Sequence, residues 1–160
     1  MNHQVVQSNN NQGGYFLLEI ALVTIVLLGA VVIAFSGREI AKNYLAKVQL
    51  KAVANTLATD IVYLQQKNLF DGDNKFYIME AESEGYSINS NKACLKRVNF
   101  AEMGCGNVYM NQFSVRIAFS NNGRPKGSKR LEVRHKMLKD LYYEVAIEPV
   151  TGRVVVHEKQ

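Results

Sequence analysis

One acidic residue, Glu19, lies inside a long apolar segment near the start of this 160-residue chain. The segment covers residues 15–35 and reads YFLLEIALVTIVLLGAVVIAF, so only Glu19, Thr24 and Gly29 fall outside the apolar types. A carboxylate within a membrane-spanning helix costs about 2.5–3.5 kcal/mol at the helix centre and less near its end. Glu19 therefore either reaches the headgroups or pairs with a cation at that depth. The second alternative would make it a functional residue.

The length of this apolar segment matches the thickness of a membrane. At about 1.5 Å per residue, such a helix spans roughly 30 Å, as a bilayer core does. The core helix of a globular protein would show a polar stripe, which this segment lacks. A secretory signal peptide has a shorter apolar region after a basic start, whereas residues 1–14 contain no Lys or Arg. We predict a transmembrane helix over residues 15–37, with signal cleavage near the small residues 34–37 as the alternative.

The residues just before Glu19 form a motif, Gly-Gly-Tyr-Phe-Leu-Leu-Glu over residues 13–19. It resembles the processing site of type IV prepilins and type II secretion pseudopilins. In that family a short polar leader ends in Gly, the next residue becomes an N-methylated amino terminus, and a Glu is fifth in the mature chain. Cleavage after Gly14 makes Tyr15 the first residue and Glu19 the fifth, whereas cleavage after Gly13 would make Glu19 the sixth. Two features depart from the family: Tyr15 replaces the common Phe, and the leader, residues 1–14, has no basic residue.

The resemblance implies partners and a location. A separate prepilin peptidase-methyltransferase would process the chain, and Glu19 would pair with the terminal amine of a neighbouring pilin or pseudopilin in a filament. The protein would sit in the bacterial inner membrane with a single span and its C-terminal part outside the cytoplasm. The positive-inside rule favours the opposite orientation, because the first basic residues, Arg38, Lys42 and Lys47, follow the apolar segment.

Beyond the apolar segment, the pattern predicts a helical stem and then a sheet. Residues 38–70 contain no Pro, and four apolar residues spaced four, four and three apart lie on one helix face: Val53, Leu57, Ile61 and Leu64. From residue 75 on, short alternating segments between turn residues indicate strands. We expect strands at 76–81, 85–89, 108–119 (one long or two short, with Phe113 among the alternating residues), 141–148 and 153–157. The fold class is therefore α+β, with a long N-terminal helix packed on a mainly antiparallel sheet over residues 71–160.

Three further patterns resemble GspH/FimT-type minor pseudopilins, and this resemblance implies the type IV pilin fold. The patterns are Leu57…Asp60-Ile61…Gln65-Gln66, then Ile117-Ala118-Phe119…Gly123, and then Val145…Thr151-Gly152-Arg153-Val154.

Two cysteines, Cys94 and Cys105, enclose ten residues. Outside the cytoplasm they can form a disulfide, which for so short a loop stabilises a fold by up to about 3 kcal/mol. The alternative is a pair of buried free thiols. Two cysteines without a nearby His make a poor zinc site.

Residues 124–139 hold seven basic residues and one acid. Gly and Pro mark the first half as a loop. Its cations could bind phosphates of DNA in a salt-dependent way: Arg124, Lys126, Lys129 and Arg130. The loop has no aromatic residue for base stacking, so a solvated loop, or one that contacts acidic surfaces, is the alternative.

We find no pattern for catalysis, and we expect neither an enzyme nor a cofactor or metal. The three histidines, His3, His135 and His157, have no companion Ser or Cys motif, and phosphate-binding and dinucleotide-binding motifs are absent. Our leading hypothesis is a structural subunit of a type II secretion-like pseudopilus. The first alternative is a minor pilin of a competence or type IV pilus whose basic loop contacts DNA. The second is an unprocessed single-pass membrane protein with a partner-binding domain.

Overall fold

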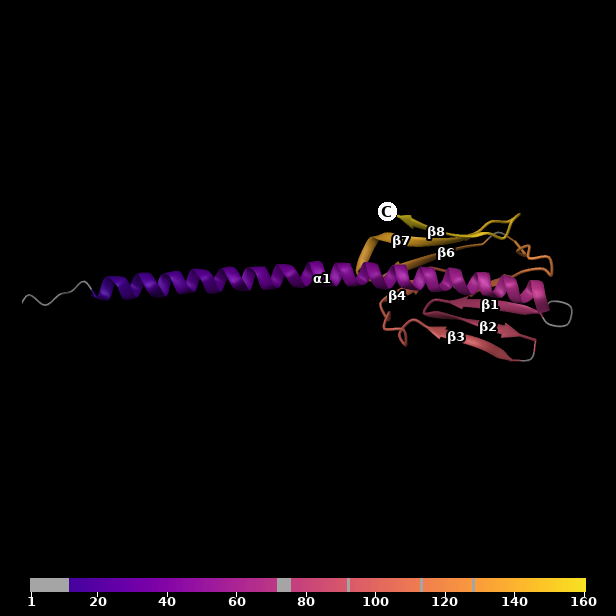
Figure 1. Cartoon of the computed structure of the whole chain (residues 1–160), viewed down its shortest axis with the longest axis horizontal. Helices are drawn as coiled ribbons and strands as arrows, with labels where there is room; N and C mark the ends of the chain where they lie inside the picture. Colours follow the sequence, from indigo (N-terminus) through magenta and orange to yellow (C-terminus); the bar gives the residue numbers. More distant parts are fainter. Residues whose placement is uncertain (1–11, 72–75, 92, 113, 128) are drawn as a thin grey trace, which may run out of the picture. The chain divides into compact units, whose positions relative to one another are not determined.

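A computed structural model describes the whole chain except residues 1–11, 72–75, 92, 113 and 128 (Figure 1). The first part of the predicted leader and Phe113 therefore lie outside the described residues. By its internal contacts the chain divides into an N-terminal unit, Met1–Lys42, and a C-terminal unit, Asn43–Gln160. Helix α1 covers Gln12–Asp71 and contributes to both units.

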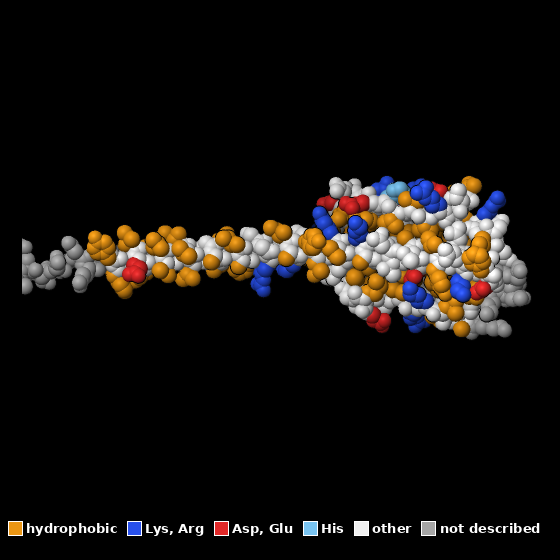
Figure 2. Space-filling model, viewed as in Figure 1, with side chains coloured by type: hydrophobic (Ala, Val, Ile, Leu, Met, Phe, Trp, Pro, Cys, Tyr) orange, Lys and Arg blue, Asp and Glu red, His pale blue; other side chains and the backbone are white. Residues whose placement is uncertain are grey.

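In the N-terminal unit, every side chain from Tyr15 to Lys42 is exposed. Figure 2 shows hydrophobic side chains along this part of α1. The helix is long and apolar enough to cross a membrane. The hydroxyl of Thr24 in this part of the helix has a hydrogen-bond acceptor nearby, because its Oγ1 donates to the carbonyl of Ile20 at 2.7 Å.

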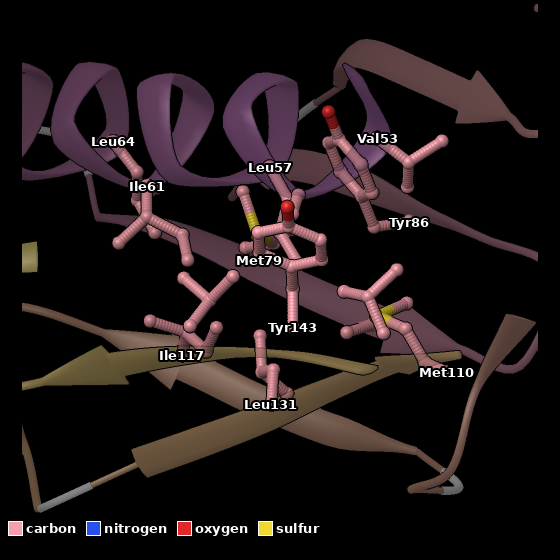
Figure 3. Close-up of a cluster of buried hydrophobic side chains, with 14 of the residues drawn as sticks. Val53, Leu57, Ile61, Leu64, Met79, Tyr86, Met110, Ile117, Leu131 and Tyr143 are labelled. Carbon is pink, nitrogen blue, oxygen red and sulfur yellow. The ribbon is translucent and has the colours of Figure 1, made fainter. Parts of the chain in front are cut away.

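In the C-terminal unit, α1 buries one face against two antiparallel sheets. The fully buried residues on this face recur every three or four positions: Leu50, Val53, Ala54, Leu57, Ile61 and Leu64. The predicted stripe of Val53, Leu57, Ile61 and Leu64 is thus confirmed. Figure 3 shows Leu57 and Ile61 directed towards Met79 and Ile117 of the strands below the helix. Burial of such side chains contributes about 1.5–3 kcal/mol each.

The first sheet has the strand order β3-β2-β1-β5. Its strands are β1 (Tyr77–Glu82), β2 (Gly85–Ser90), β3 (Cys94–Asn99) and β5 (Val115–Ala118). The second sheet has the order β4-β6-β7-β8. Its strands are β4 (Val108–Met110), β6 (Lys129–His135), β7 (Leu138–Ile147) and β8 (Val154–Lys159). All pairings are antiparallel, and one hydrophobic core joins both sheets to α1.

The α+β prediction is confirmed. Of the two alternatives for 108–119, two short strands is the correct one, because β4 pairs with β6 in the second sheet and β5 pairs with β1 in the first. Two other details differ from the sequence-based expectation. Strand β3 was not expected, since most of its side chains are exposed and lack apolar alternation. The basic segment 124–139 is not one loop, because β6 occupies Lys129–His135. On β6 the apolar side chains point inwards, and the charged ones alternate with them.

Candidate functional site

Glu19 lies on the surface of α1, four residues after Tyr15 and therefore one helical turn away on the same side. Its neighbours in this turn, Phe16, Ile20 and Val23, are exposed apolar side chains. The first basic residue in the chain is Arg38, which is 19 positions further along, or roughly 28 Å along a helix. Residues 15–37 therefore offer no cationic side chain that could pair with Glu19.

A second site, within the C-terminal unit, gathers three segments around Gln65 of α1. The side-chain amide of Gln65 donates to the carbonyl of Gly123 at 2.8 Å. Gly123 belongs to a turn closed by Ser120 and Arg124, and Gly152 belongs to the turn between β7 and β8. The structure thus brings together the three patterns that carried the GspH/FimT resemblance.

Both turn glycines are required by local geometry. Gly123 and Gly152 have φ angles of 75° and 69°, a region that other residues adopt only with strain. A Cβ on Gly152 would lie 2.7 Å from the carbonyl oxygen of Gly123 and 2.5 Å from Nε2 of Gln65. The backbone of these turns can approach α1 because no side chain intervenes.

Asn68, which the sequence analysis did not single out, joins α1 to the first sheet. It is fully buried, and its amide donates to the carbonyl of Tyr77 at 3.0 Å while its Oδ1 accepts from the Tyr77 N–H at 3.1 Å. The β1–β5 pairing starts one residue later, at Ile78 opposite Ala118. The Asn68 side chain therefore makes the two backbone hydrogen bonds to Tyr77 that a further residue of β5 would otherwise make. Its spacing of four residues after Leu64 continues the apolar stripe of α1, which is the sequence signal that could have identified it.

A buried carboxylate, Asp60, anchors α1 to strands β2 and β3 of the same sheet. It accepts a hydrogen bond from the Tyr86 hydroxyl at 2.6 Å and an ion pair from Lys96 at 2.7 Å. Burial, followed by the hydrogen bond to Asp60, raises the pKa of Tyr86, so the phenol remains a donor. Lys96 lies on β3, which explains how a strand with few buried side chains stays attached to the core.

The four predicted phosphate contacts do not face in one direction. Arg124 and Lys126 lie on the turn before β6, and the ammonium of Lys126 lies 4.1 Å from the ring centre of Phe76. Lys129 and Arg130 are consecutive residues of β6, so their side chains point to opposite faces of the sheet. Further along β6, Arg134 pairs with Glu132 at 3.0 Å.

The predicted disulfide between Cys94 and Cys105 is not present, because both thiols are free. Cys94 starts β3, and Cys105 is held beyond the other end of this strand, where its N–H donates to the carbonyl of Phe100 at 2.8 Å. Six extended residues place the two ends of β3 about 16 Å apart, and a disulfide requires Cα atoms within about 7 Å. Cys94 is exposed and Cys105 is buried, so only one of them matches the alternative of two buried thiols.

The two thiols are expected to react at very different rates. Burial raises the pKa of the Cys105 thiol and blocks access, whereas Cys94 is exposed. Brief alkylation of the native protein at neutral pH should modify Cys94 at least about tenfold faster than Cys105. Peptide mass spectrometry measures both rates. Equal rates, or a mass two hydrogens lower with neither thiol modified, would contradict this arrangement.

The polar contacts of Asp60, Gln65 and Asn68 hold strands and turns of the C-terminal unit against α1. In the described parts of the chain, no group of three His, Cys, Asp or Glu side chains is placed to hold a metal ion. The described structure combines a helix whose apolar segment, residues 15–35, has a single acid with two antiparallel sheets that pack on the later part of the same helix. Comparisons with protein families, with curated proteins and with solved structures find no match to this chain.

Proposed function

We propose that this protein is a prepilin-like subunit, a minor pilin or pseudopilin that is trimmed after Gly14 and added to a membrane-rooted filament. Within that class, we favour a structural subunit of a type II secretion-like pseudopilus. A single observation carries the proposal: Glu19, the fifth residue counted from Tyr15, lies in the exposed apolar part of α1, where residues 15–37 contain no Lys or Arg.

The geometry around Glu19 supports a pairing role. Cleavage after Gly14 would create a positively charged amine one helical turn from the carboxylate of Glu19. In a medium of low dielectric, a charge pair is strongly favoured over two separate charges. Glu19 of one subunit could pair with the terminal amine of a neighbouring subunit. Repeated from subunit to subunit, this pairing would fix the register of a filament.

The C-terminal unit supports a structural role in a different way. Its contacts with α1 through Asp60, Gln65 and Asn68 use buried or half-buried polar groups on one side of the helix. The opposite side of α1 keeps exposed apolar residues even in this unit, among them Tyr44 and Val48. A helix held rigidly on one side and left apolar on the other suits packing against further helices.

The test is the mature amino terminus, measured by intact mass after expression in a host that has a prepilin peptidase. We expect loss of residues 1–14 and the added mass of one methyl group on Tyr15. Gly14→Leu should leave the chain at full length, because a bulky side chain would occupy the cleavage position. Gly13→Ala, which changes the neighbouring position by one methyl group, should be processed as the parent is.

Two results would contradict the proposal. An intact Met1 in the parent chain would favour an unprocessed single-pass membrane protein. A new terminus near Gly37 would instead indicate ordinary signal-peptide cleavage.

A further inference from the structure

His135, at the end of β6, is a buried histidine that the proposed function does not use. Its side chain and backbone are 2% exposed. Both ring nitrogens have neighbours at hydrogen-bonding distance: the N–H of Met137 donates to Nδ1 at 3.1 Å, and Nε2 lies 3.4 Å from Oε1 of Gln49 on α1. The ring therefore joins the β6–β7 turn to the helix.

These contacts define which nitrogen carries the proton. Because a backbone N–H can only donate, Nδ1 must be an acceptor and hence unprotonated. The single proton of the neutral ring is then on Nε2, where it points to the Gln49 carbonyl oxygen. The orientation of the Gln49 amide agrees with this protonation state. Its Nε2 donates to the carbonyl of Gly104 at 2.7 Å, which leaves Oε1 as the acceptor for His135. A doubly protonated ring would set Nδ1–H against the N–H of Met137, so protonation removes one hydrogen bond and buries a charge.

The same contacts hold the turn that contains Cys105. Gln49 binds the carbonyl of Gly104, and the N–H of Lys136 donates to the carbonyl of Asn107 at 2.9 Å. Both ends of the 104–107 turn are thus fastened to groups adjacent to His135. Movement of the β6–β7 turn away from α1 would release this turn and expose the buried thiol.

The charged side chains on the segments around His135 lie at the surface. The segments packed around His135 are α1, the 100–107 turn, β4 and the start of β7. Their titratable groups are the buried Cys105 and Tyr109, whose side chain points to the other face of the sheet. The charged side chains flanking the contact residues on these segments are all exposed: Lys47, Lys51, Glu102, Lys136, Lys139 and Asp140. Burial lowers the pKa of His135.

We propose that His135 is a proton-operated latch: the neutral ring holds the β6–β7 turn and the Cys105 turn against α1, and protonation opens both turns. This inference does not depend on the proposed filament function.

The sign of the pH effect follows from linkage. The closed form keeps His135 neutral, whereas in the open form the ring titrates near its ordinary pKa of about 6.5. The open form therefore binds more protons in mildly acidic solution, and the closed form loses stability as the pH falls below about 6.5. Between pH 7.5 and 5.5, the open population should rise by a factor approaching ten.

The test follows thiol modification of the full-length protein in detergent micelles over this pH range. The measured quantity is the rate at Cys105 divided by the rate at Cys94, so that the exposed Cys94 serves as the internal reference at each pH. We expect the ratio to rise about tenfold from pH 7.5 to 5.5. A ratio that stays constant would overturn the latch.

Two matched variants identify the titrating group. His135→Asn retains an acceptor for the Met137 N–H but cannot be protonated, so the ratio should become independent of pH. His157→Asn removes an exposed histidine on β8 and should leave the rise unchanged. A rise that persists in His135→Asn would overturn the proposal. If His135→Asn does not fold, hydrogen exchange of residues 133–140 in the parent chain, corrected for intrinsic rates, must lose protection over the same range, and unchanged protection would also overturn it.

Discussion

Replacement of Gly152 by alanine is expected to destabilise the C-terminal unit by about 3 kcal/mol or more. The positive φ of 69° alone costs a non-glycine residue about 1–2 kcal/mol. The new methyl group would also lie 2.7 Å from the backbone oxygen of Gly123, which cannot rotate away as a side chain can. Overpacking of this kind adds about 1–3 kcal/mol. The melting temperature should fall by roughly 10 °C or more.

Gly104→Ala is the matched control for this prediction. Its φ of 75° is nearly the same, but a Cβ there would meet no other atom within 4 Å. It should therefore show only the backbone cost of about 1–2 kcal/mol. Since the chain has eight Tyr and no Trp, near-ultraviolet circular dichroism of the tyrosines can follow unfolding. Equal losses for Gly104→Ala and Gly152→Ala would show that the approach to Gly123 and Gln65 contributes nothing.

Asn68→Leu is expected to have an effect of similar size, for a different reason. Leucine branches at the same carbon as asparagine and suits a buried helix position, yet it would leave the N–H and the carbonyl of Tyr77 without the partners that Asn68 provides. Each buried unsatisfied group costs about 1–3 kcal/mol, so we expect a loss of about 3 kcal/mol in the free energy of unfolding. The end of β1 should also detach first, which hydrogen exchange at Tyr77 would detect.

Asn55→Leu provides the comparison, because Asn55 is exposed on the same helix. That substitution should change stability by no more than about 0.5 kcal/mol. If Asn68→Leu were equally mild, the paired hydrogen bonds to Tyr77 would not hold β1 on the helix.

Several features of the fold follow from periodicity alone. The stripe of Val53, Leu57, Ile61 and Leu64 predicts the buried face of α1, because a helix has one face to bury. Strands β1, β2, β7 and β8 are also expected from local alternation and turn residues. Strand β6 was obscured by its charges: seven basic residues in 124–139 suggested a loop, but on a strand the alternate positions can be charged without entering the core.

The spacing of the two cysteines in the sequence does not predict their separation in space. Cys94 and Cys105 are close in the chain, and short separation favours ring closure. The intervening β3 is extended, however, and extension separates residues that a flexible loop would bring together. The pairing of β3 with β2 and the bond from Lys96 to Asp60 decide this outcome, and neither is visible in the local sequence.

By itself, the sequence determined the membrane-length apolar segment, the place of Glu19 four residues after Tyr15, and the α+β class. These properties depend on neighbours within one or two helical turns or on alternation along one strand. Only the tertiary structure decided that Gln65 would meet Gly123 and Gly152, that Asn68 would complete the edge of β1, and that His135 would be buried against Gln49. Each of these contacts joins residues between 9 and 87 positions apart. The packing of two sheets on one helix determines such contacts, and local sequence patterns carry no information about them.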